Sequence, residues 1–149
     1  MNADKMIDIL QANRLMRSPS EIAAFENALI ELAQNPEDRW LPELHLALDD
    51  RCQQQEVMWD LIHFLESFDM KAQLLAFVKV LPELMARTPE WTKILYYRIC
   101  NDESARVLYQ EILQDLNLEV GKIAELLNAD ISGNDEEARL YAPVRSALL

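Results

Sequence analysis

The scarcity of glycine constrains this chain more than any other feature of its sequence. Only Gly121 and Gly133 occur among 149 residues, and neither belongs to an Asn-Gly or Asp-Gly step. Two-residue β-hairpins favour such steps, because their turns require positive φ. Two glycines also cannot supply a GxGxxG fingerprint or a Walker loop, which excludes the nucleotide-binding sites built on those motifs.

The apolar residues are of the kinds that favour helices. The chain has 24 leucines and 16 alanines, against 6 valines, 10 isoleucines and 2 threonines. β-branched side chains lose rotamer freedom in a helix, whereas leucine and alanine do not. Because half of the residues are apolar, the chain can also bury a substantial core. We predict a single all-α domain over residues 1–149, with about seven to nine helices.

Proline and capping residues divide the chain into short helices. Ser18-Pro19-Ser20-Glu21 is a capping box with proline at the first helical position. Asn35-Pro36 is expected to start a helix that Leu41-Pro42 interrupts, and Leu81-Pro82 to bend or end another. The other predicted helices cover about residues 3–15, 19–34, 53–68, 70–80, 89–100, 102–116 and 118–128, with a loop at Ser132-Gly133-Asn134.

Two internal echoes suggest a repeat. Leu41-Pro42-Glu43-Leu44 recurs at 81–84, and residues 61–75 align with 94–108 so that Asp69 matches Asp102. Paired helices at such periods are typical of α-solenoids such as HEAT arrays. Because the two echoes have different offsets, two architectures stay open: antiparallel hairpins stacked as a short HEAT-like solenoid, or an irregular bundle.

No motif indicates catalysis or metal binding. The only histidines are His45 and His63, and Asp60-x-x-His63 is a single motif where di-iron bundles need two with further carboxylates. Cys52 and Cys100 are too few for a disulfide framework and are expected to be buried thiols. We therefore expect no enzymatic activity, no catalytic residues, no cofactor and no metal.

The net charge of −12 argues against direct binding to nucleic acid or to an anionic membrane surface. No signal peptide and no run of 18 apolar residues is present, so we expect a cytoplasmic protein. The charge is uneven: residues 21–69 contain twelve acids and two arginines, a net of −10, whereas residues 70–100 have a net of +3. This acidic stretch is either a solvated face or a landing surface for a basic partner.

The predicted helix at 53–68 favours the landing surface. Its apolar stripe leaves Trp59, Asp60 and His63 on the opposite side, and a tryptophan among carboxylates has the composition of an interface hot spot. The alternative is that Trp59 packs on a neighbouring helix; Trp40 and Trp91 are expected in the core. The predicted partner-binding residues are Glu37, Asp38, Asp49, Asp50, Glu56, Trp59, Asp60, His63 and Glu66.

Residues 38–69 and 80–113 resemble the small helical immunity proteins of bacterial polymorphic-toxin systems. The resemblance is closest to the HEAT-like kind paired with contact-dependent growth inhibition toxins, immunity protein family thirty, and covers about residues 20–115. It rests on Trp40-Leu41-Pro42-Glu43-Leu44, the Trp59 helix, Thr88-Pro89-Glu90-Trp91 and Asn101-Asp102-Glu103-Ser104.

The resemblance implies a cytosolic inhibitor that binds one cognate toxin domain, often a basic RNase, and blocks its active site. We expect acids within 37–66, with Trp59 as an anchor, to pair with Lys and Arg lining the cleft of that nuclease. Two other functions stay open. The first is a non-catalytic HEAT-like adaptor that binds a helical peptide or partner protein, and the second is a small enzyme.

Overall fold

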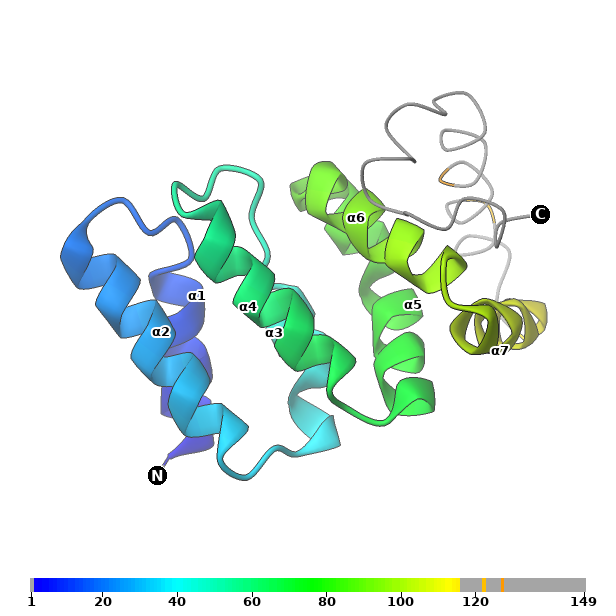
Figure 1. Cartoon of the computed structure of the whole chain (residues 1–149), viewed down its shortest axis with the longest axis horizontal. Helices are drawn as coiled ribbons and strands as arrows, with labels where there is room; N and C mark the ends of the chain where they lie inside the picture. The colour runs from blue at the N-terminus through cyan, green and yellow to red at the C-terminus, as the bar shows by residue number, and fades with distance from the viewer. Residues whose placement is uncertain (1, 116–121, 123–126, 128–149) are drawn as a thin grey trace. The chain divides into compact units, whose positions relative to one another are not determined.

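The computed structural model describes residues 2–115 together with Lys122 and Leu127. These residues form seven α-helices and one short 3-10 helix without any strand, which confirms the predicted all-α class (Figure 1). Apart from Lys122 and Leu127, the predicted helix at 118–128 lies outside the described residues, and so does the loop at 132–134. The helices are α1 (Ala3–Ala12), α2 (Pro19–Ala33), η1 (Asp38–Trp40), α3 (Leu41–His45), α4 (Gln55–Glu66), α5 (Met70–Arg87), α6 (Pro89–Cys100) and α7 (Glu103–Gln114).

The chain divides into two compact units, Met1–Phe77 and Val78–Leu149, with the boundary inside α5. Within the part of the chain that the structure describes, no helix is long and apolar enough to cross a lipid bilayer.

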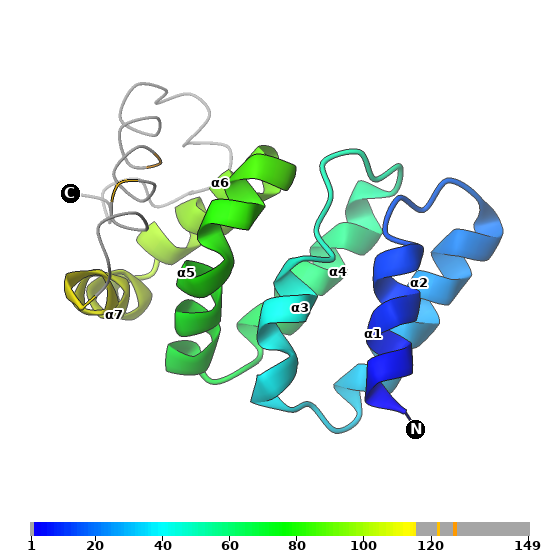
Figure 2. The same cartoon turned by 180° about the vertical axis from the view of Figure 1, so that it is seen from behind.

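The first unit contains two antiparallel helical hairpins. Helix α1 packs on α2, α3 packs on α4, and α2 also contacts α4. In Figure 1, α2 and α4 lie side by side and run in the same direction, and Figure 2 shows α1 and α3 on the opposite side. The unit therefore has two layers, α2 with α4 and α1 with α3. Fully buried side chains fill its interior, among them Leu10, Phe25, Leu32, Leu44, Met58 and Leu61.

The capping box predicted before α2 is present in a modified form. The Ser18 hydroxyl accepts a hydrogen bond from the Glu21 amide at 3.2 Å, as an N-cap should. The Glu21 carboxylate, however, accepts from the backbone amide of Arg17 at 2.8 Å, one residue before the usual partner. It also forms an ion pair with the Arg17 guanidinium at 2.9 Å, which holds the chain where it enters α2.

An ion-pair cluster of Arg14, Asp49 and Arg51, the Asp49 cluster, ties the loop before α4 to the end of α1. The Asp49 carboxylate lies 2.9 Å from Arg14 Nε and 3.0 Å from Arg51 Nη2. Burial alone would raise the pKa of Asp49, but hydrogen bonds from Arg51 and Arg14 outweigh it and lower that pKa below its ordinary value. Beside the cluster, the Gln53 amide donates to the Leu15 carbonyl at 2.9 Å.

In the second unit, α6 packs on α7. Trp91 and Tyr97 of α6 are fully buried, and the Tyr96 and Tyr109 rings meet edge to face with centroids 5.6 Å apart. Asp102 caps α7 by accepting from the Ala105 amide at 2.9 Å, as Asp69 caps α5 through the Ala72 amide at 3.0 Å. The predicted alignment of Asp69 with Asp102 thus pairs two residues that each cap the start of a helix.

The proline junctions differ from what the sequence predicts. Of the two outcomes predicted at Leu81-Pro82, a bend or an end, the end is wrong, because α5 continues through it to Arg87. Pro42, in contrast, lies in the first turn of α3. The two Leu-Pro-Glu-Leu segments therefore occupy different structural positions. The helix expected from Asn35-Pro36 begins only at Asp38, as a 3-10 turn.

Two apolar side chains that share the inward stripe of their helix by spacing are exposed. Met70 is 39% exposed at the start of α5, and Ala33 is exposed at the end of α2. Both lie at helix ends, where less of the neighbouring structure covers them.

Candidate partner-binding site

A groove of about 420 Å³ runs between α2 and α4 in the first unit. Each helix supplies four residues at positions i, i+3, i+4 and i+7, the spacing of one helical face. Most of the lining is apolar, and none of the eight side chains is a lysine or an arginine. The lining residues, hereafter the α2–α4 groove, are Glu26, Leu29, Ile30, Ala33, Asp60, His63, Phe64 and Ser67.

The two helices present their residues in the same order along the groove. Each stripe begins with an acid, Glu26 or Asp60, and ends with a small residue, Ala33 or Ser67. Because α2 and α4 run in the same direction (Figure 1), both carboxylates lie toward the end of the groove where the helices begin. The groove is therefore acidic at one end, mainly apolar along its middle and lined by small side chains at the other end.

Ile30 gives the middle of the groove an exposed apolar surface. Its side chain is 60% exposed, the largest value among the exposed large hydrophobic residues of the described chain. Across the groove, Phe64 is buried and packs edge to face on Phe68, with ring centroids 5.0 Å apart. A partner that covers Ile30 would therefore remove apolar area from water over a preformed wall.

Trp59 lies beside the groove without lining it. It is partly buried, and its indole ring lies against the His63 imidazole with centroids 6.0 Å apart. Because His63 does line the groove, Trp59 supports one of its walls.

Five of the nine predicted partner-binding residues belong to α4. Four of these five are exposed. Two of them, Asp60 and His63, line the groove together with Glu26 of α2. The exposed residues of α4 in this set are Glu56, Asp60, His63 and Glu66.

Asp49 has a different place from the one that the charge pattern suggests. Its side chain is only 4% exposed, and Arg14 and Arg51 already neutralise its carboxylate. It therefore stabilises the loop before α4 and does not belong to a surface that a partner could reach. Asp50, next to it, is partly exposed.

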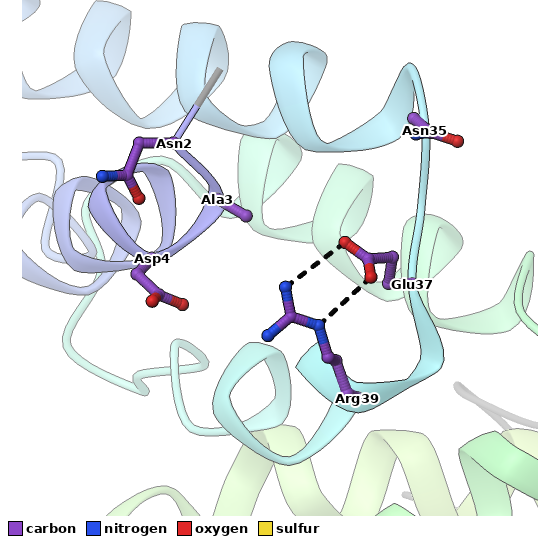
Figure 3. Close-up of a pocket in the computed structure, with 6 residues that line it drawn as sticks. All are labelled: Asn2, Ala3, Asp4, Asn35, Glu37 and Arg39. Carbon is purple, nitrogen blue, oxygen red and sulfur yellow. Dashed lines mark hydrogen bonds and ion pairs between the residues drawn. The ribbon is translucent and has the colours of Figure 1, made fainter.

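Glu37 and Asp38 do not belong to α4 but lie at the start of η1. Glu37 lines a second, polar pocket with Asn2, Asp4, Asn35 and Arg39 (Figure 3). Within it the Arg39 guanidinium bonds the Glu37 carboxylate at 3.1 Å, so this acid has an internal partner. Asp38 is exposed.

His45, a possible acid–base group by residue type, is enclosed in the core. It is fully buried; its Nδ1 lies 2.6 Å from the Leu41 carbonyl oxygen and its Nε2 lies 3.1 Å from Gln73 Nε2. Nδ1 must therefore donate, and Nε2 must accept from the Gln73 amide. Burial lowers the pKa of His45 to about 4, so the ring is neutral near pH 7.

Cys52 and Cys100 are both buried, as expected. Among residues 2–115, 122 and 127, no three His, Cys, Asp or Glu side chains gather closely enough to hold a metal ion.

Sequence reasoning missed the contribution of α2 to the groove. Ile30 lies outside the inward stripe of that helix, so it is an apolar side chain on an otherwise polar face. That departure from the helical period is the signal that could have identified it. Glu26 carries no comparable signal, because acids are common throughout residues 21–69.

An all-α fold with an exposed apolar groove closed by acids at one end has the geometry of a protein-binding module. A family model for Immunity protein 30 matches residues 12–109, about two thirds of the chain, which therefore belongs to the Immunity protein 30 family. Comparisons with curated proteins and with solved structures gave no match. Membership implies that a cognate toxin is the partner and that the chain neutralises it by a non-catalytic role.

Proposed function

We propose that this chain neutralises a basic nuclease toxin by covering its active site with the acidic, exposed face of α4. The observation that carries the proposal is the joint position of Asp60 and His63 in a groove that has acids but no lysine or arginine in its lining. Membership in an immunity family supplies the kind of partner.

Electrostatics supports a basic partner. A nuclease cleft is lined by Lys and Arg because it must bind phosphates. Carboxylates on a complementary surface can pair with those side chains and raise the association rate. Residues 21–69, which include all of α4, carry a net charge of −10. Occupation of the cleft by protein carboxylates would then compete with the nucleic-acid substrate.

Growth protection tests the proposal directly. A toxin domain sought among the genes next to the one that encodes this chain is expressed with the wild type or with the double variant Trp59→Ala/Asp60→Lys. We expect the wild type to restore growth and the double variant to fail while its far-UV circular dichroism stays helical. A Val107→Ala/Glu111→Lys double variant on α7 makes similar changes at exposed positions and should protect fully.

Salt dependence and substrate identify the finer mechanism. Binding to a basic cleft should weaken steeply between 50 and 300 mM salt, roughly the range over which screening of exposed charges grows. The toxin alone should degrade RNA or DNA, and the wild type should stop this. Full protection by Trp59→Ala/Asp60→Lys would overturn the proposed face, and salt-independent binding would favour an apolar, peptide-in-groove adaptor instead.

A further inference from the structure

We infer that the α2–α4 groove receives an apolar side chain of the toxin that is flanked by a lysine or arginine. This inference rests on the proposed function and adds α2 to the interface. Its first support is that Ile30, 60% exposed in the last turn of α2, gives the groove an apolar lining that water contacts in the free protein. Exposed apolar area of this kind is typical of sites that a partner covers.

The charge at one end of the groove specifies the chemistry of the occupant. Glu26 and Asp60 come from different helices and lie toward the same end, while the lining contains no lysine or arginine. A cation placed there would meet two carboxylates, whereas an anion would be repelled. The occupant that matches both parts is an apolar side chain with a Lys or Arg next to it in the toxin surface.

The same charges argue against a second copy of this chain as the occupant. Two such faces would each bring the net charge of −10 of residues 21–69 to the contact. Like charges placed together across an interface cost free energy and slow association. With a basic partner the charges attract instead, which favours the complex and speeds association.

Size limits what the groove can hold. Its volume of about 420 Å³ lies at the lower end of the range for ligand pockets, so it suits one or two side chains rather than a whole helix. Ala33 and Ser67 keep the far end open, because neither has a side chain longer than two heavy atoms. A larger residue at either position would fill this space without entering the core.

Two substitutions test occupation of the groove, with binding to the toxin domain of the growth assay measured by calorimetry. Ile30→Asp should raise the Kd at least about thirtyfold, the loss typical of a hot-spot residue. The matched control, Val107→Asp, places the same charge at another exposed β-branched residue, 46% exposed on α7, and should change Kd by less than about threefold. Ala33→Trp should block the groove, whereas Ala86→Trp, at another exposed alanine near a helix end, should not.

Charge reversal tests the acidic end. Glu26→Lys/Asp60→Lys should weaken binding and flatten its salt dependence, whereas Glu103→Lys/Glu111→Lys on α7 has the same net charge and should do neither. Unchanged Kd for both Ile30→Asp and Ala33→Trp, with tight wild-type binding, would overturn the groove and leave the proposed function standing. No binding by the wild type would overturn the proposed function itself.

Cross-linking identifies the occupant. A photoreactive benzoyl-phenylalanine at position 30 should cross-link the toxin, and the captured peptide should contain an apolar residue within three positions of a Lys or Arg. Cross-links to a second copy of this chain, or to an acidic toxin segment, would overturn the inference.

Discussion

Replacement of His45 by glutamine should change how the stability of this protein depends on pH. Glutamine cannot titrate, and its side-chain oxygen can take the place of Nε2 as acceptor for the Gln73 amide, 3.1 Å away in the wild type. In the wild type, burial lowers the pKa of His45 from 6.5 to about 4. Between these two values the unfolded chain binds a proton that the folded chain does not.

The sign of the effect follows from this difference. The contribution of neutral His45 to the free energy of unfolding is complete above pH 6.5 and is lost as the pH falls toward 4. With these two pKa values, the loss between pH 7.5 and pH 5.0 amounts to about 2 kcal/mol. Other groups also titrate in this range, but they are common to the wild type and the variant.

Urea unfolding at pH 7.5, 6.0 and 5.0 measures the effect. All three pH values lie above the pI of about 4.5, where solubility is lowest. The free energy of unfolding of the wild type minus that of His45→Gln should be about 2 kcal/mol smaller at pH 5.0 than at pH 7.5. A difference between the two proteins that stays constant with pH would refute the burial of a neutral imidazole. An NMR titration of the His45 ring gives an independent readout, because its pKa should lie well below that of a free histidine.

Three other substitutions probe stability, each followed by the urea midpoint. Asp49→Asn should lower the free energy of unfolding by about 2 kcal/mol, because the Arg14 and Arg51 guanidinium groups lose a buried anionic partner; an unchanged midpoint would contradict this role. Ser18→Ala should cost about 1 kcal/mol through loss of the N-cap bond to Glu21, with Ser20→Ala as the exposed control. Pro82→Ala should stabilise the protein by about 1 to 2 kcal/mol, because a proline inside α5 removes a helical hydrogen bond; a lower midpoint would show that the ring's packing matters more.

Helix positions were predictable wherever local chemistry determines them. Pro19 and Pro89 begin helices that match their predicted starts, because proline fits the first turn, where its missing amide is not needed. Proline is a poorer guide at Leu81-Pro82, where a helix end at about residue 80 was predicted and is wrong. There α5 continues because packing of the buried Leu81 and Leu84 compensates for the lost hydrogen bond, which is a tertiary effect.

The candidate site could be predicted only on one side. The helical period places Asp60 and His63 on the outer face of α4, but it does not say which helix lies beside them. The burial of Asp49 also could not be predicted from the sequence, because its partner Arg14 is 35 residues away along the chain. Met16 shows a similar limit: it adopts a φ of 48° while 1% exposed, where a turn would ordinarily use glycine, so the packing of its side chain outweighs the backbone strain.

The bonds around the Asp49 cluster have a consequence for how specificity can change. Arg14 and Leu15 lie in the loop between α1 and α2, and Asp49 and Gln53 lie in the loop before α4, so these contacts join the two loops that lead into the groove walls. The spacing of the walls is thus set before a partner arrives, and little conformational entropy is lost on binding. Ile30, Ala33 and Ser67 line the groove walls and take no part in these ion pairs or in the Gln53–Leu15 hydrogen bond. Immunity to a new toxin could therefore evolve by exchange of those side chains, with the frame that holds them left intact.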